Sequence, residues 1–366
     1  MTANHTDKPL RVLVAGGGVA GLETVMALHD LAGPRVEMTL LSPASEFVYQ
    51  PLSVREPFAE GAADSYPLAS IAADFDVELI AGELDSVAPE QHTAITKSGT
   101  ELPYDALVLA LGARREQPFD RVTTFRGGED SEALHGLVQD VETGYTRRVA
   151  FVVPPGVTWA LPLYELALMT ARRAREMGGA PELTLITPEE APLAVLGPEA
   201  SADVAALLGA AGIALETTAN AEVHGGRLVT IRPAGKVIEA DRVVAVPVLH
   251  GTAPRGIPAD ADGFIAVDTH GRITGAVDVY AAGDGVQFPI KQGGIATQQA
   301  DAVAEVIAKR AGVPLVPLPF RPVVHGKVMT GGSNDRSLGA DKIAGLYLAP
   351  YLAARQPRVT AAGRSA

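Results

Sequence analysis

The sequence contains no cysteine among its 366 residues. This absence excludes a disulfide, a zinc–thiolate site and a dithiol redox relay within the chain. The eight histidines form no metal-ligand spacing, and the pairs of acidic residues suggest no metal site either. We therefore expect a protein without a bound metal ion.

Basic charge and long apolar runs are scarce as well. Lys and Arg number 30 against 43 Asp and Glu, which gives a formal net charge of −13. A surface that binds nucleic acid would show clusters of basic residues, so we expect no nucleic-acid partner. No apolar run approaches the length of a membrane-spanning helix, and no signal-peptide core precedes the first strand. We expect a cytoplasmic protein, with peripheral attachment to the inner face of the cell membrane left open.

A glycine-rich motif follows the first apolar run. Residues 11–23 read RVLVAGGGVAGLE, a strand, a tight turn and the start of a helix that together contain G-x-G-x-x-G. Gly16 permits the turn, Gly18 leaves room beside a pyrophosphate, and Gly21 lets the helix pack close to the strand. N–H groups at the start of the helix would hold the diphosphate. The residues that we expect to contact the dinucleotide are Gly16, Gly18, Val19, Ala20 and Gly21.

The second strand is expected over residues 36–41, and Ser42 and Pro43 follow it. An Asp or Glu usually ends this strand and binds the adenosine ribose. Ser42 can still bond a hydroxyl group but carries no charge, which disfavours NAD in this half of the chain. Residues 46–61 are too rich in proline and aromatics for regular structure. Tyr49 and Gln50 are predicted cofactor contacts. Tyr49 and Pro51 either line a ring-binding cleft or pack the loop.

A second β-α-β unit starts at Arg147 and points to a parallel sheet flanked by helices. Its first turn, residues 154–159, reads PPGVTW where a dinucleotide-binding unit would have glycines. Bulky residues and residues without an N–H oppose close approach of a pyrophosphate. We expect an NAD(P)-binding-like domain with a degenerate glycine motif.

A strand is expected over residues 264–268, and the most specific pattern follows it: TGAVDVYAAGD, residues 274–284. It matches the pattern of FAD proteins in which Thr, four free positions and four mostly apolar positions precede Gly-Asp. Gly283 permits close approach, and Asp284 is expected to bind a ribityl hydroxyl, although an Asp that ends a strand is otherwise often a helix cap. Together with the first glycine motif, the pattern predicts FAD as the cofactor.

A helix is expected over residues 295–311, and its N-terminus should point at the flavin pyrimidine ring. Negative charge accumulates on that ring during reduction, and a helix N-terminus stabilises it. Lys291 would add to this effect. Gly294 and Ile295, in the first turn, are predicted cofactor contacts.

Residues 104–118 contain a buried strand closed by Ala110, Leu111 and Gly112, and this strand resembles the end of the first cofactor lobe of two-dinucleotide flavoproteins. Over residues 11–311 the chain resembles the sulfide:quinone oxidoreductases and type II NADH dehydrogenases of the pyridine nucleotide-disulfide oxidoreductase superfamily. The resemblance implies an α/β fold of two Rossmann-like domains, the second inserted in the first, and makes Ala110 and Gly112 cofactor contacts. The implied divisions are an FAD-binding domain (8–118 and 248–312), the NAD(P)-binding-like domain (119–247) and a short C-terminal segment (313–366).

Local matches carry the resemblance to single residues. Residues 295–300, IATQQA, are similar to the Ala-x-Gln-Gln segment that these enzymes place at the quinone pocket, which suggests Gln298 and Gln299 as acceptor contacts. The segment Tyr-Glu-Leu-Ala resembles the one that sets a glutamate beside the flavin. Glu165 is then either a proton carrier or a first-turn acid that complements the helix dipole.

The departures narrow the function that the resemblance implies. Without cysteine, sulfide oxidation through a persulfide is excluded. We expect an FAD-dependent oxidoreductase that passes electrons from an unidentified small-molecule donor to a quinone-like acceptor. The alternatives are NAD(P)H as the donor, or a flavin-binding protein without catalysis. In the C-terminal segment a strand is expected over residues 321–330. An apolar, aromatic face over residues 341–355 either packs on the body or docks at a membrane, and a homodimer is possible.

Overall fold

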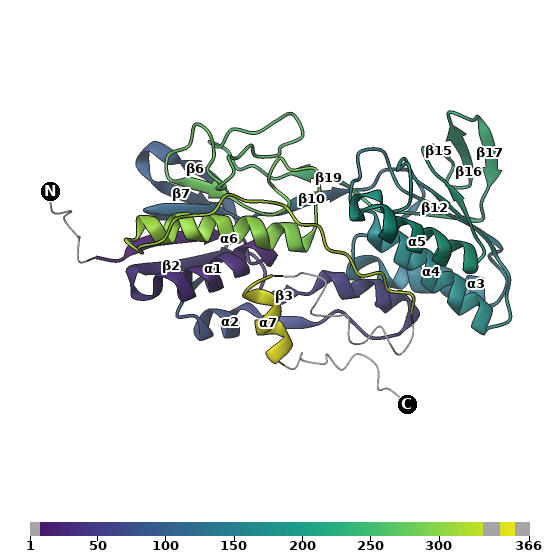
Figure 1. Cartoon of the computed structure of the whole chain (residues 1–366), viewed down its shortest axis with the longest axis horizontal. Coiled ribbons are helices and arrows are strands. Elements are labelled where there is room, and N and C mark those ends of the chain that lie inside the picture. The colour runs from purple at the N-terminus through teal and green to yellow at the C-terminus, as the bar shows by residue number, and fades with distance from the viewer. Residues whose placement is uncertain (1–7, 332–344, 356–366) are drawn as a thin grey trace.

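The protein, seen in a computed structural model that describes residues 8–331 and 345–355, consists of two lobes side by side along its long axis (Figure 1). Each lobe is built on a five-stranded sheet in which every paired strand is parallel to its neighbours. Helices cover these sheets, as βαβ connections require. The α/β class and the two Rossmann-like sheets predicted from the sequence are confirmed.

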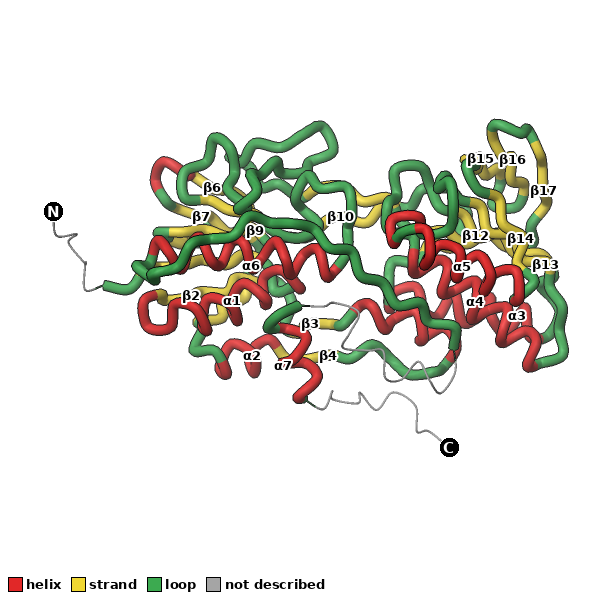
Figure 2. Tube along the Cα trace, in the orientation of Figure 1, coloured by secondary structure: helices red, strands yellow, loops and turns green. Residues whose placement is uncertain are grey.

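The first lobe has the strand order β20-β9-β1-β2-β5. Its strands are short apolar runs with buried side chains, typical of parallel strands covered on both faces. Helices α1 and α6 lie side by side along one face, and a three-stranded antiparallel sheet, β6-β7-β8, belongs to the same lobe (Figures 1 and 2). The elements of this lobe are β1 (Leu10–Ala15), α1 (Val19–Ala32), β2 (Val36–Ser42), β3 (Glu46–Val48), β4 (Ser65–Pro67), α2 (Leu68–Asp74), β5 (Glu78–Ala81), β6 (Leu84–Ala88), β7 (Thr93–Thr96), β8 (Glu101–Pro103), β9 (Ala106–Leu109), β20 (Val279–Ala281) and α6 (Gly293–Arg310).

The second lobe has the strand order β11-β18-β12-β13-β14, with α4 between the first two strands of its βαβ unit. An antiparallel sheet, β15-β16-β17, is appended to it, and its first hairpin turns at the expected Gly225-Gly226. The elements are β11 (Thr123–Thr124), α3 (Ser131–Glu142), β12 (Arg148–Val152), α4 (Leu161–Glu176), β13 (Glu182–Ile186), α5 (Pro198–Ala210), β14 (Ile213–Glu216), β15 (Asn220–His224), β16 (Leu228–Arg232), β17 (Lys236–Glu239) and β18 (Arg242–Ala245).

Two antiparallel strands join the lobes. β10 (Ala113–Glu116) leaves the first lobe directly after β9, and β19 (Val248–Gly251) brings the chain back. The second lobe is therefore inserted between two pieces of the first. This pairing also fixes where the turn after β9 lies relative to the second lobe.

Two local expectations are wrong. Residues 46–61 are regular: β3 is followed by a 3₁₀ helix over Gln50–Phe58, since Pro51 occupies its first turn, where a missing N–H costs nothing. Residues 264–268 form no named strand, only isolated bridges. The reason is competition from side chains: the Asp260 carboxylate accepts from the N–H of Phe264, and Asp268 accepts from the N–H of Arg272.

After α6 the chain turns back and runs beside this helix toward the second lobe (Figures 1 and 2). We call residues 312–331 the strap. Its second half, expected as a strand over residues 321–330, pairs with no strand among the described residues. The prolines of the strap have no N–H group to donate to a neighbouring strand. Its backbone is bonded instead by side chains of α6 and α4.

The C-terminal helix α7 (Leu348–Ala354) packs on α1, with Leu348 and Leu352 buried in the shared core. The buried carboxylate of Glu23 accepts from the N–H groups of Tyr347 (2.9 Å) and Leu348 (2.7 Å). Of the two alternatives for residues 341–355, packing on the body therefore applies to residues 345–355. Residues 341–344 and those beyond 355 lie outside the described chain. Within the described residues no helix has the length and apolar character to cross a membrane.

Asp301 lies beside Glu23 under this helix, and its pKa is raised to about 8 by burial first and by the charge of Glu23 second. Burial also raises the pKa of Glu23. The pair therefore holds a proton that the unfolded chain would release near pH 4, and folding stability falls as the pH rises from about 4 to about 8.

Asp301→Asn should remove this dependence. We expect the melting temperature of the variant to exceed that of the wild type by roughly 3 °C at about pH 8.5, and by less at about pH 5.5. Differential scanning calorimetry at both pH values measures this, with the exposed Asp203→Asn on α5 as the control. If the melting temperatures of the wild type and of Asp301→Asn differ by the same amount at both pH values, the two acids do not share a proton.

Candidate functional site

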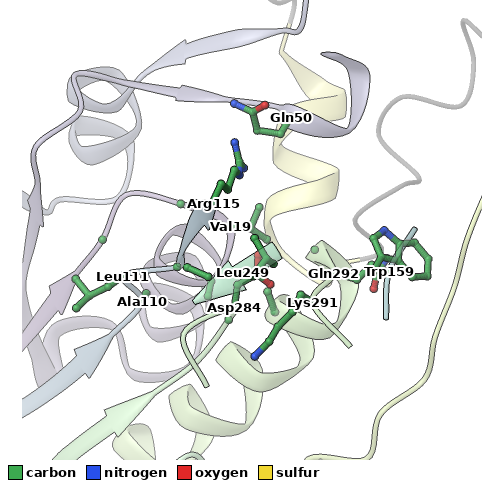
Figure 3. Close-up of a pocket in the computed structure, with 18 of the residues that line it drawn as sticks. Val19, Gln50, Ala110, Leu111, Arg115, Trp159, Leu249, Asp284, Lys291 and Gln292 are labelled. Carbon is green, nitrogen blue, oxygen red and sulfur yellow. The ribbon is translucent and has the colours of Figure 1, made fainter. Parts of the chain in front are cut away.

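A cavity of about 1200 Å³ lies where the carboxyl ends of the first sheet, the linker strands and the start of α4 meet. In Figure 3, Arg115 extends toward Gln50, while Trp159 and Gln292 lie on another side of the same space. The strap closes part of it with His325, Gly326 and Lys327. The sequence-predicted residues among its lining are Gly16, Gly18, Val19, Ala20, Ser42, Pro43, Gln50, Ala110, Gly112, Glu165, Gly283, Asp284 and Lys291.

The first glycine turn has the shape that a dinucleotide needs. Gly16 has φ +119°, and a side chain there would overlap the carbonyl oxygen of Ala110. A side chain on Gly21 would overlap the carbonyl oxygen of Gly16, so this glycine serves the close packing of α1 on the turn and does not line the cavity. At Gly18 a side chain would meet nothing within 4 Å, because this position faces the open cavity. The turn therefore leaves a pyrophosphate room beside the backbone.

A second turn, after β20, brings Asp284 to the same cavity. Gly283 has φ +87°, and a side chain on it would come within 3.0 Å of Ala20. No donor from the described residues bonds to the carboxylate of Asp284. Burial raises the pKa of that carboxyl, and the positive charges of Lys291 and Arg115 oppose the rise. A hydroxyl group of a ligand is a partner that would satisfy this carboxylate.

Lys291 approaches the cavity from the loop before α6. Its Nζ donates to the carbonyl of Val286 and lies 3.9 Å from the ring centroid of Phe264. Burial lowers the pKa of Lys291 to about 8, although Asp284 and Asp260 favour the charged form. The amine is therefore a positive charge that small changes nearby can neutralise close to neutral pH.

The start of α6 differs from expectation in one respect. Gln292 is its N-cap, and the side-chain oxygen of Gln292 accepts from the N–H of Ile295 at 3.1 Å. Gly294 and Ile295 do not line the cavity, whereas Gln292 and Gly293 do. The helix N-terminus still faces the cavity, but the residues that line it, Gln292 and Gly293, come two positions earlier than the predicted Gly294 and Ile295.

The pair Gln298 and Gln299 lies outside the cavity lining and has protein partners. The buried Gln299 accepts from the N–H of Gly283 at 2.8 Å, which fixes the turn that carries Asp284. Gln298 bonds the backbone of Val323 twice, at 2.9 Å from each end of its amide. Their acceptor-binding role stays a prediction, and the structure gives them positions that support the cofactor turn and the strap.

On the opposite wall, Ser42 and Pro43 line the cavity as predicted. The hydroxyl of Ser42 accepts from the N–H of Ala44 at 3.2 Å. Ser42 is the last residue of β2 and stands where an Asp or Glu would bind a ribose. Tyr49 packs in the hydrophobic core and does not line the cavity, so of its two readings the structure shows the packed one. Gln50, its neighbour, does line it.

Sequence reasoning missed Arg115 and Trp159. Arg115 comes from β10 and donates to the carbonyl of Arg126, which brings the linker strand to the cavity. Two consecutive arginines, Arg114 and Arg115, follow soon after Gly112 and are a signal that could have found it. Trp159, the last residue of the degenerate turn, lines the cavity where a glycine would leave space for a nucleotide.

Glu165 lies on the second turn of α4, lines the cavity and is 1% exposed. Its Oε1 accepts from the N–H of Met329 in the strap at 2.8 Å. A buried carboxylate at a cavity wall is a group that can take up and release a proton. The alternative was a first-turn acid that only complements the helix dipole, whereas Glu165 lies on the second turn and is buried. Its role as a proton carrier stays a prediction.

The equivalent turn of the second lobe, residues 154–159, differs from the glycine turn of the first lobe. These residues precede α4, whose N-cap is Ala160 and whose first turn contains Pro162. Gly156 alone of residues 154–159 has positive φ. The carboxylate of Glu189, just after β13, accepts from the hydroxyls of Tyr164 (2.6 Å) and Thr187 (2.9 Å). An acid that would bind a ribose in a dinucleotide site is thus held by the protein.

Comparison with known proteins identifies the family. The model of the pyridine nucleotide-disulphide oxidoreductase family matches residues 10–300. The chain belongs to this family. It is accordingly an FAD-dependent oxidoreductase, and the two glycine turns that meet in one cavity fit FAD. Among the described residues no group of acidic or histidine side chains is placed to hold a metal ion.

Individual relatives are distant. The chain is 29% identical to a sulfide-quinone reductase of Aquifex aeolicus over 173 residues, which cover 46% of this chain and 40% of that protein. It is 25% identical to the alternative NAD(P)H-ubiquinone oxidoreductase C1 of Arabidopsis thaliana, over 93% of this chain and 75% of that one. The solved sulfide:quinone oxidoreductase of Aquifex aeolicus superposes with a TM-score of 0.73 at 22% identity, covering 83% of this chain and 78% of that one. This last likeness is one of fold.

Proposed function

We propose that the protein passes electrons from a small-molecule donor other than NAD(P)H, through FAD, to a quinone-like acceptor. The observation that carries this proposal is the reach of the cavity. Its volume is about 1200 Å³, and it extends past the cofactor turns to Trp159, Glu165 and the strap. A second, apolar ligand would bind in this part of the cavity.

The relatives support the acceptor class. Both curated relatives named above are quinone reductases by name, although one is aligned over less than half of its length. A quinone ring is flat and apolar with two carbonyl oxygens, and Trp159 offers an aromatic surface for such a ring. The proposal differs from the sulfide-quinone reductase in its chemistry, because a chain without cysteine cannot carry a persulfide.

The second lobe argues against NAD(P)H as the donor. A dinucleotide would need the N–H groups of a glycine turn and a free carboxylate for its ribose. Here Pro154 and Pro155 lack N–H groups, and Glu189 is bonded to Tyr164 and Thr187. NAD(P)H remains the second candidate donor, because the Arabidopsis thaliana relative is an NAD(P)H-ubiquinone oxidoreductase by name.

The residues of the cavity have different roles. FAD, when bound, supplies the redox chemistry, and the protein orients it and sets its potential. Gly16, Gly18 and Asp284 would hold it, and Lys291 with the start of α6 would offset negative charge. Glu165 would carry the proton that quinone reduction consumes, from a position inside the cavity wall.

The two halves of the reaction can be tested apart. The purified protein is reduced anaerobically with dithionite and mixed with a water-soluble ubiquinone analogue in a stopped-flow instrument, and we expect the flavin absorbance to return at a rate that rises with quinone concentration. In a separate experiment NADH and NADPH should bleach the flavin no faster than buffer. If quinone does not reoxidise the flavin, the proposal of a quinone-like acceptor is wrong. If NADH or NADPH bleaches the flavin quickly, the proposal of a donor other than NAD(P)H is wrong.

A further inference from the structure

The ammonium group of Lys291 lies over an aromatic ring. Its Nζ is 3.9 Å from the ring centroid of Phe264, and the same nitrogen donates to the carbonyl of Val286. Lys291 and Phe264 both line the cavity. The face of an aromatic ring is negative and attracts a cation, most strongly where water is excluded. The ring therefore favours the charged form of an amine whose burial favours the neutral form.

The position of Phe264 comes from a turn over residues 260–264. The carboxylate of Asp260 accepts from the N–H of Phe264 at 2.8 Å, and the N–H of Asp260 donates to the carbonyl of Phe264 at 2.9 Å. Within the turn Gly263 has φ +82° and lies against Gly251 of β19, so closely that a side chain on either glycine would overlap the backbone of the other. These contacts replace the strand expected at residue 264, and they fix the ring next to the linker strand.

The residue after this turn connects it to the segment between β20 and α6, which carries the lysine. The N–H of Ile265 donates to the carbonyl of Gly285 at 2.9 Å, and the carbonyl of Ile265 accepts from the N–H of Gln287 at 2.7 Å. The side chain of Gln287 donates to the carboxylate of Asp260 at 3.1 Å. The aromatic ring and the amine are therefore held in a fixed relation by two segments that bond each other.

The amine has no bonded acid to neutralise it. Among the described residues no carboxylate forms an ion pair with Lys291, while Asp284, near it in Figure 3, and Asp260 favour its charged form from farther away. The charged or titratable groups that line the same cavity from β10, α4 and the strap are Arg115, Glu165, His325 and Lys327. An aromatic ring can thus stabilise the ammonium group here without cancelling its charge, as a bonded carboxylate would.

We propose that Phe264 is a positioning residue, which holds the ammonium group of Lys291 in the cofactor cavity as an uncompensated positive charge. This inference rests on the proposed function, in which Lys291 offsets negative charge on reduced FAD. A positive charge beside a group that becomes more negative on reduction stabilises the reduced form and raises the reduction potential. The ring would therefore set how far up the pH scale this effect extends.

Phe264→Leu tests the proposal in the full-length, FAD-loaded protein. Leucine keeps an apolar side chain beside the amine but has no aromatic face, so Lys291 should lose its proton at lower pH than in the wild type. Near pH 8.5 we expect the equilibrium constant for two-electron reduction of the flavin to fall roughly three- to fivefold, which is about 15–20 mV. At about pH 6 the amine is charged in both proteins, and their potentials should lie close together, because the wild-type pKa is about 8.

Potentials are measured by spectroscopic titration against a reference dye, without donor or quinone, and the ratio of flavin to protein is determined for each variant. Phe264→Tyr keeps an aromatic face and should restore the wild-type pH profile. The matched control is Phe320→Leu. Phe320 is also half-buried, packs edge-to-face on Phe288 and does not line the cavity, so its loss should leave the pH profile unchanged.

A double-mutant cycle with Lys291→Met separates the aromatic contact from packing. In the Lys291→Met background Phe264→Leu should have no further effect on the potential. An equal shift with and without the lysine means that the ring acts by packing, and it overturns the proposal, as do identical potentials of the wild type and Phe264→Leu at every pH. If Lys291→Met itself leaves the potential unchanged, the role of the lysine in the proposed function is wrong as well. Failure of quinone to reoxidise a protein with the expected pH profile counts only against the proposed acceptor.

Discussion

Asp284→Ala should purify largely without its yellow colour. The carboxylate is half-buried, faces the cavity and has no partner among the described residues, so a cofactor hydroxyl is the group that it is placed to bind. Hydrogen bonds to a charged group contribute about 1.5–3 kcal/mol, which corresponds to roughly ten- to a hundredfold in affinity. The measurement is the ratio of flavin to protein absorbance after purification, followed by titration of the apoprotein with FAD.

A matched control separates cofactor binding from folding. Asp262 is an exposed aspartate of the same lobe that does not line the cavity, and Asp262→Ala should keep its full flavin content. Circular dichroism spectra of both variants should match the wild type. Stoichiometric FAD in Asp284→Ala would contradict the role that we assign to this residue.

Glu165→Gln should slow quinone reduction by roughly 10²–10⁴-fold while the protein keeps its flavin, because an amide cannot deliver a proton. Gln retains a side-chain oxygen that can accept from Met329, so the attachment of the strap is preserved. The rate is measured by reoxidation of the dithionite-reduced protein with a water-soluble quinone across a range of pH.

The control for this variant lies on the same helix. Glu176→Gln alters the exposed last residue of α4 and should leave the rate unchanged. If Glu165 carries the proton, the wild-type rate should depend on pH, and this dependence should disappear in Glu165→Gln. A structural role predicts a lower melting temperature with an unchanged rate, and that result would refute the proposal.

The cofactor turns could be predicted from the sequence because each is a local device. The turn around Gly16 needs a strand, glycines at fixed spacing and a helix, all within one short segment. The turn at Asp284 likewise follows a buried apolar strand at once. Steric and packing requirements of this kind act between neighbours in the sequence, so the residue pattern records them.

Contacts over long sequence distances could not be predicted in this way. Glu165 meets Met329 across 164 residues, and nothing in either local pattern indicates the other. The resemblance suggested that Gln298 and Gln299 bind the electron acceptor. In the structure Gln298 is hydrogen-bonded to Val323 of the strap, and Gln299 accepts from the N–H of Gly283. Arg115 was missed for the same reason, since the pairing of β10 with β19 brings it to the cavity.

The strap has a mechanical consequence for the enzyme. It is fastened to α6 of the first lobe through Gln298 and to α4 of the second through Glu165, while Thr158 bonds the carbonyl of Pro289 across the same gap. A hinge motion about β10 and β19 would have to part all of these bonds together. We therefore expect the lobes to move as one body during turnover, so that ligands exchange by diffusion through a fixed opening.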